Sequence, residues 1–215
     1  SNVDTQTYLF LDDVVRQGNA PAGYPSTWTG TPADYAMSQL AADLPLIAGN
    51  ASLSVDEARE IIKQSLRALP TMSLVLAPGD MFDPTVGIYT NPGQRGMAWE
   101  KPTSVEFIPS DSSEGFQIDA GIRIAGFTSR DPNLTPKHSL RLFFREAEYG
   151  AAKLEYPLFP DAEVEEFNQI SLRANARDSW LAAHAQSIAA NSYIRDQWAK
   201  ESQAAMGVPA LAGRF

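Results

Sequence analysis

The 215-residue chain contains no cysteine, which excludes disulfides, cysteine nucleophiles and thiolate metal sites. Its only two histidines, His138 and His184, lie too far apart in the sequence to indicate a zinc site. No apolar run approaches the roughly 18 residues that span a bilayer, which predicts no membrane insertion. Positive charge is in deficit, because 17 lysines and arginines stand against 26 acidic residues. The net charge of −9 argues against a general nucleic-acid-binding protein.

The short motifs of several large enzyme classes are also absent. The sequence has no GxxxxGK[ST] or GxGxxG phosphate loop, no HExxH zinc motif and no GxSxG nucleophile elbow. No repeat of solenoid or propeller length is apparent. With 44% hydrophobic and 20% charged residues, the composition is that of an ordinary globular protein long enough to bury a sizeable core.

The order of the patterns along the chain predicts an α+β fold with a mostly antiparallel sheet. Residues 1–70 are expected to form an arm and a helix that pack on a body made by residues 71–215. Ser54 and Glu57 form a capping box before a helix over about 54–69, whose apolar stripe should pack on the sheet. A C-terminal helix, capped by Asn191 or Ser192, should also pack on it. Strands are expected at 73–78, 86–91, 104–109, 116–124, 140–145 and 169–175.

The most informative segment is residues 116–150, where two runs alternate between apolar and polar positions. In the first run the even-numbered residues from Phe116 to Ile124 are apolar, whereas Arg123 lies on the opposite face. In the second run Leu140, Leu142 and Phe144 point one way, and Arg141, Phe143 and Arg145 point the other. Two such runs predict neighbouring strands that carry arginines on one face of a sheet.

These arginines, with Arg173 and the loop residue Lys137, are candidates for an anion site. Guanidinium groups bind phosphate or carboxylate through two parallel hydrogen bonds, so several on one face could hold a phosphate. The alternative is a solvated face on which each arginine pairs with a carboxylate. The carboxylates considered are Asp119, Glu106, Glu146 and Glu148. His138 is interpreted as a loop residue rather than a base, and Asp178 either as a strand-end carboxylate or as a helix cap.

An ordered series of short motifs resembles the N-terminal half of the CotH family, which is named after a spore coat protein and comprises atypical protein kinases. The resemblance covers roughly residues 72–215, and the segment from Tyr8 to Pro70 is similar to an extension found in large bacterial surface proteins of this family. The motifs are GIYTN (87–91), WEKPTSVE (99–106), FQIDAGIRIAG (116–126), PKHSLRLFFR (136–145), YG (149–150), KLEYPLF (153–159), SLRANARDSW (171–180) and YIRDQWA (193–199).

The resemblance implies a fragment of an atypical Ser/Thr kinase that contributes a cationic wall to a nucleotide-phosphate site. Arg123, Lys137, Arg141 and Arg145 are the cofactor-binding candidates. ATP and Mg²⁺ are the implied cofactors of the intact protein, while none is expected for the fragment. The family's catalytic and metal-binding acids are expected beyond Phe215, so no catalytic or metal residue is assigned within this chain. Transfer of labelled phosphate by these 215 residues alone to a serine-rich peptide would contradict that expectation.

The implied partners are the remaining C-terminal half of the parent protein and a serine-rich protein substrate. The implied location is extracellular or at a bacterial cell surface, or cytoplasmic for a member of the spore-coat type. A different reading is a non-enzymatic surface module for assembly or carbohydrate contact. That reading expects Trp28, Trp99 and Trp180 to be exposed on one concave face, because sugars stack on aromatic rings.

Overall fold

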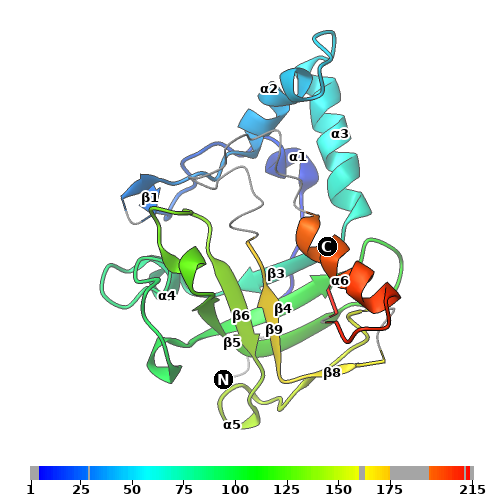
Figure 1. The fold of residues 1–215 in the computed structure, drawn as a ribbon. Helices are drawn as coiled ribbons and strands as arrows, with labels where there is room; N and C mark the ends of the chain where they lie inside the picture. Colours follow the sequence, from blue (N-terminus) through cyan, green and yellow to red (C-terminus); the bar gives the residue numbers. More distant parts are fainter. Residues whose placement is uncertain (1–4, 29, 160–162, 175–193, 211, 214–215) are drawn as a thin grey trace.

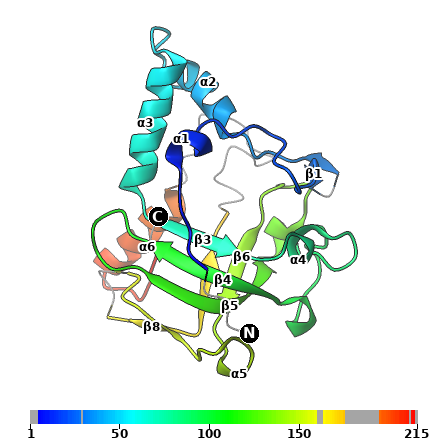
Figure 2. The same ribbon diagram turned by 180° about the vertical axis from the view of Figure 1, so that it is seen from behind.

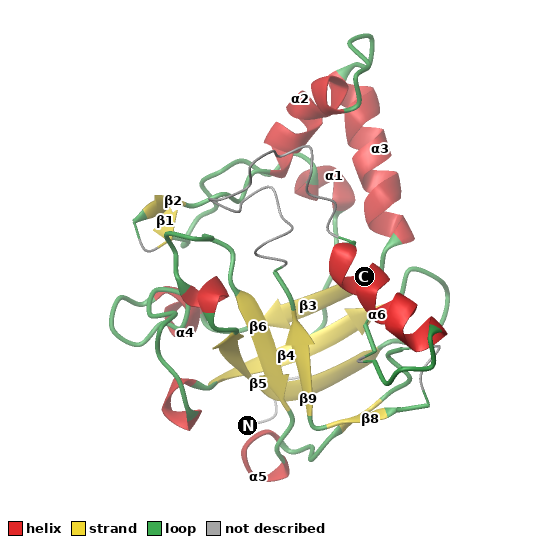
Figure 3. Ribbon diagram, viewed as in Figure 1, coloured by secondary structure: helices red, strands yellow, loops and turns green. Residues whose placement is uncertain are grey.

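The computed structural model describes residues 5–28, 30–159, 163–174, 194–210 and 212–213. Its centre is a five-stranded antiparallel sheet in the order β3-β4-β5-β6-β9, accompanied by helices, which confirms the α+β class (Figures 1 and 3). The sheet strands are β3 (Thr71–Val75), β4 (Lys101–Ile108), β5 (Phe116–Ala125), β6 (Ser139–Phe143) and β9 (Gln169–Leu172). Two small pairs are β1 (Thr27–Trp28) with β2 (Thr31–Pro32), and β7 (Leu154–Glu155) with β8 (Glu166–Phe167).

Helices surround the sheet rather than forming a continuous layer on it (Figure 3). The α-helices are α1 (Leu11–Val14), α2 (Met37–Ile47), α3 (Val55–Ala68), α4 (Pro78–Phe82), α5 (Glu146–Tyr149) and α6 (Arg195–Ala205). Single 3-10 turns occur at η1 (Met97–Trp99) and η2 (Thr128–Arg130). In the described part of the chain, no helix is both long and apolar enough to cross a membrane.

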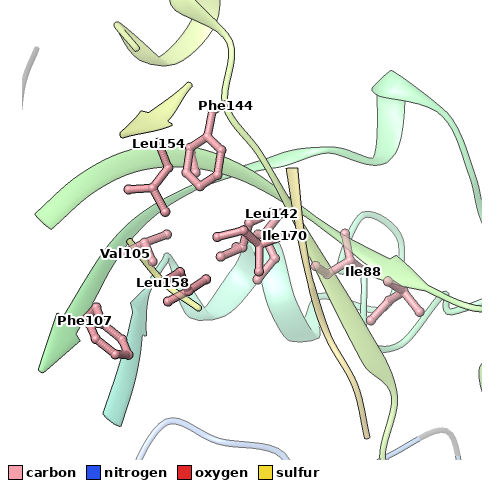
Figure 4. Packing of buried hydrophobic residues seen from close by; sticks show 11 residues of the cluster. Ile88, Val105, Phe107, Leu142, Phe144, Leu154, Leu158 and Ile170 are labelled. Carbon is pink, nitrogen blue, oxygen red and sulfur yellow. The ribbon is translucent and has the colours of Figure 1, made fainter. Parts of the chain in front are cut away.

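The two faces of the sheet differ as the alternating runs predict. On one face Val105, Ile122 and Leu142 are fully buried in the main core, with Phe144 and Leu158 beside them (Figure 4). The opposite face is polar and carries the arginines. Over β3 and β4 this polar face is covered by the N-terminal segment (Figure 2). The segment is held there by hydrogen bonds from Thr5 to Ser104, from Thr7 to Ser73 and from the Thr7 amide to Glu106.

The helix predicted over 54–69 is α3, and its capping box is present. The Ser54 hydroxyl accepts from the Glu57 amide, and the Glu57 carboxylate accepts from the Ser54 amide. Its expected packing on the sheet is wrong. Ala58 and Ile62 instead form a separate small core with Val15 and Ala41, so α2 and α3 stand away from the sheet as a helical hairpin (Figure 1). An amphipathic stripe requires an apolar partner but does not specify which one.

The strand expected over 86–91 is also wrong, because this segment folds into turns. Asp83 draws the chain round by accepting hydrogen bonds from Thr85 and from the Val86 amide. The amide of Ile88 then donates to the carbonyl of Asp80, and that of Tyr89 to the carbonyl of Met81. These local bonds use the backbone groups that a ladder would need, since Asp side chains favour turns over strands.

The C-terminal helix is present as α6, but it has no side-chain cap, and the expected caps at 191 and 192 lie outside the described residues. It buries no residue, so its expected packing on the sheet is wrong. Its large apolar side chains lie in solvent instead, with Trp198 68% and Met206, just after the helix, 70% exposed. The helix is tied to the sheet region by an ion pair between Arg173 and Asp196, at 3.2 Å.

Candidate functional site

The polar face of β5 and β6 centres on a carboxylate that sequence reasoning missed. The side chain of Glu100, just before β4, is only 3% exposed and pairs with two of the predicted site residues. Arg145 donates from Nε to Glu100 Oε1 at 3.0 Å, and Arg123 Nε lies 3.2 Å from Oε2. The Tyr149 hydroxyl donates to Oε1 at 3.2 Å. Burying a carboxylate this far from water would be costly without such partners. We call Glu100 and its three partners the Glu100 cluster.

Two further residues shape the Glu100 cluster. The ring of Phe143 lies under both guanidinium groups. The Cζ atoms of Arg123 and Arg145 are 3.8 and 5.1 Å from its centroid. Gly121 leaves room for the carboxylate, because a Cβ there would lie 2.5 Å from Glu100 Oε1 and 2.6 Å from its Cγ. Gly121, two residues before Arg123, therefore marks a close approach by the Glu100 side chain.

Arg141 sits directly opposite Arg123 in the β5–β6 register. Like charges at facing positions repel each other, and the two side chains are held by different partners. Arg141 donates from Nε to the Ser171 hydroxyl on β9 at 3.1 Å, whereas Arg123 pairs with Glu100. Among the described residues Arg141 has no carboxylate partner.

Arg130 adds a cation that the sequence did not reveal, since nothing in its local pattern distinguishes it from a surface loop residue. Its guanidinium donates to the carbonyls of Pro92, Gln94, Ile124 and Gly126, and to no carboxylate in the described chain. Burial lowers the pKa of Arg130, and repulsion from Arg95, Arg123 and Arg141 lowers it further. Arg95, Arg123 and Arg141 therefore lie close enough to Arg130 to act on its charge.

The loop residues before β6 behave differently from the arginines. Lys137 is exposed, and no described contact joins its ammonium group to the arginines. His138 is 4% exposed and packs against the Tyr89 ring, with its Nδ1 2.8 Å from the Ser129 carbonyl. Burial lowers the pKa of His138, and the nearby Arg130 acts in the same direction. His138 is thus a buried side chain in the loop before β6, held by the Tyr89 ring and the Ser129 carbonyl.

The alternative, in which each arginine pairs with a carboxylate, holds for Arg123 and Arg145 but, within the residues that the structure describes, not for Arg141, and the carboxylate is not one of those considered. Arg123 and Arg145 do meet a carboxylate, yet it is Glu100, and in the described chain neither forms an ion pair with Asp119, Glu106, Glu146 or Glu148. Glu106 accepts from the Thr7 amide instead. Asp178 lies outside the described residues. The structure thus brings Arg123, Arg141 and Arg145 to one face and leaves Lys137 apart.

Tyr149 provides a pH-dependent test of the Glu100 cluster. Burial and the Glu100 charge raise the pKa of Tyr149 to about 12, against about 10 for a free phenol. A raised folded-state pKa means that the stabilisation by the neutral phenol is present below about pH 10 and is lost between about pH 10 and 12. We expect the NMR signal of ζ-carbon-labelled Tyr149, assigned with Tyr149→Phe, to titrate last among the tyrosines that the structure describes. A midpoint near 10 would contradict the assigned contact.

The tryptophans do not form the exposed face that a carbohydrate module would need. Trp28 packs edge-on against Tyr35 and Tyr89 and donates from its indole nitrogen to the Tyr35 hydroxyl. Trp99 packs against the main core. Trp180 lies outside the described residues. Packed rings offer less area for sugar stacking, so the carbohydrate reading gains no support from the two described tryptophans of that set.

Comparison of the chain with models of known families, with curated proteins and with solved structures finds no match. The resemblance to the CotH family therefore stays a prediction. The described residues include no group of three or more His, Asp or Glu side chains that could hold a metal ion, so we assign no Mg²⁺ ligand among them.

Proposed function

We propose that the arginine face of β5 and β6 binds phosphate groups, and that the chain serves as the cationic wall of a nucleotide site in a CotH-like atypical kinase. The observation that carries this proposal is the juxtaposition of Arg123 and Arg141 at facing positions, with Arg130 close by. Glu100 compensates only part of this charge. A local excess of guanidinium groups in a chain of net charge −9 is a reason to expect an anionic ligand.

Arg141 is the best-placed group to meet a ligand. It is held only by a neutral hydroxyl, and that bond can be exchanged for a charge-assisted bond to phosphate. Arg123 and Arg145 are already engaged by Glu100, so their contribution is mainly long-range attraction. Lys137, exposed before β6, is placed to add a further contact only if the loop approaches the ligand. ATP with Mg²⁺ is the cofactor proposed for the intact protein, by resemblance alone.

Binding of tripolyphosphate and of ATP to the full 215-residue chain, measured by calorimetry at low ionic strength, tests this function. Arg141→Gln should weaken binding about tenfold, corresponding to about 1.4 kcal/mol. Lys153→Gln is the matched control, because it removes the same charge at the opposite end of β5, where Lys153 pairs with Glu166. Equal losses in the two variants, or no binding by the wild-type chain, would refute the proposal.

A further inference from the structure

Strand β5 has a neighbour on both edges for only part of its length. β4 pairs with it from Phe116 onward, whereas β6 pairs with it only from Gly121. Alternate residues of an antiparallel strand direct their N–H and C=O groups to the same edge. In the described part of the chain, no strand and no other backbone group bonds to the β6-side edge over 116–120. Residues 116–120 therefore have an open edge on the β6 side, although β4 pairs with their other side.

A hollow of about 580 Å³ lies along this open edge. It is lined by residues 116–118 of β5, by residues 151–155 and by Glu166 of β8. β8 lies below the N-terminal part of β5 in both views (Figures 1 and 2). The wall is anchored, because Leu154 is buried in the main core and Tyr156 packs its ring on Phe116. The hollow is thus a fixed groove between a strand edge and a packed segment.

The groove is acidic. Glu155 and Glu166 line it, and its only lysine, Lys153, is already paired with Glu166 at 2.5 Å. With two carboxylates and one ammonium group, the lining carries one uncompensated negative charge. The charge left over is negative, so an occupant should be basic.

We propose that this edge binds an extended peptide in which apolar residues alternate with lysine or arginine. Such a peptide would add a strand beside 116–120, and the unpaired backbone groups would supply the main-chain hydrogen bonds. Because side chains alternate along a strand, one set would face the apolar side near Phe116 and Ile118. The other set would carry the basic side chains, near Gln117 and the acids that line the groove, Glu155 and Glu166.

A second copy of this chain is a poorer occupant of the groove. Pairing two copies edge to edge would bring Glu155 and Glu166 of one copy toward the same acids of the other, and like charges at close range oppose association. A basic strand from another protein meets no such repulsion. The same edge is the kind of unpaired strand that natural proteins protect from self-pairing with charge.

The test uses a peptide of alternating valine and lysine, about six residues long as in an ordinary strand, added to the isotope-labelled full chain. NMR shift changes should concentrate at 116–120 and 151–155, and amides of 116–120 should exchange more slowly with solvent. A peptide methylated on alternate backbone nitrogens should not bind, because it cannot complete the ladder. A peptide with glutamate in place of lysine should not bind either.

Glu155→Lys should weaken binding of the valine–lysine peptide about tenfold, whereas the matched charge reversal Glu201→Lys on α6 should leave it unchanged. Both residues are exposed, so neither change should prevent folding. Equal binding of the methylated peptide, shift changes centred on another surface, or equal losses in the two variants would overturn the proposal. So would dimerisation of the chain through this edge in place of peptide binding.

Discussion

Replacing Glu100 with alanine is expected to lower the free energy of unfolding by about 2 to 3 kcal/mol. The substitution leaves Arg123 and Arg145 without their shared carboxylate and the Tyr149 hydroxyl without its acceptor. Loss of one partner from a fully buried pair costs about 3 to 5 kcal/mol. The two arginine side chains keep 20% and 32% exposure, so water screens part of the loss. Urea unfolding followed by circular dichroism measures the difference.

Glu166→Ala is the matched control for this experiment, because it also removes a carboxylate from an ion pair, here at the small β7–β8 pair. Its pair with Lys153 is about half exposed on both sides, at 46% and 56%, and such pairs contribute within about 1 kcal/mol. Similar losses in the two variants would mean that the Glu100 cluster does not stabilise the fold beyond an ordinary surface pair.

Glu100→Ala should strengthen anion binding although it weakens the fold. Without Glu100, the charges of Arg123 and Arg145 are no longer compensated and become available to a phosphate. Tripolyphosphate affinity should therefore rise several-fold while stability falls. A rise in affinity would mean that Glu100 limits the arginine charge available to a phosphate, whereas a drop would mean that it positions the arginines for binding.

The alternating runs predicted the most about this fold. A period of two places Leu142 and Phe144 in the core and leaves Arg141 and Arg145 on the other face, and both outcomes are confirmed. Alternation does not give register, however. That Arg123 faces Arg141 follows only from the pairing of β5 with β6, which depends on contacts across the intervening loop.

Glu100 shows why the candidate site could be predicted only in part. Its partners Arg123, Arg145 and Tyr149 are distant in sequence and converge only because β4, β5 and β6 lie side by side. The one local signal was Gly121, which leaves a position without a side chain in the middle of an alternating strand. Such a glycine could have indicated that another side chain packs over the strand there.

The errors have a related cause. Residues 86–91 contain Val86, Ile88 and Tyr89, which favour strands, yet Asp83 upstream commits the chain to turns. The apolar stripe on α3 is present in part, since Ala58 and Ile62 are buried while Ile61 is exposed, and its partner is α2 rather than the sheet. Local patterns describe what a segment can bury, whereas the partner is chosen by the whole chain.

Gly121→Ala should destabilise the protein by about 1 to 3 kcal/mol through a steric conflict with the Glu100 side chain. The three atoms nearest to the added Cβ, at 2.5 to 2.7 Å, all belong to Glu100. A free glutamate would rotate away at little cost, but this one is held by Arg123 and Arg145. Gly79→Ala is the control, because nothing lies within 4 Å of a Cβ there and alanine favours the helix α4 that contains it.

A double-mutant cycle separates this conflict from a general intolerance of β5 to a side chain at position 121. If Gly121→Ala acts through Glu100, it should cost much less in the Glu100→Ala background, because the atoms that it strikes are gone. The coupling energy should then be about 1 to 2 kcal/mol, within the range for residues in contact. Additive losses would instead assign the role of Gly121 to the neighbouring strands, at its register positions Pro102 on β4 and Phe143 on β6. The cycle therefore tests, with stability alone as the readout, whether the buried carboxylate occupies the place on the arginine face that the structure gives it.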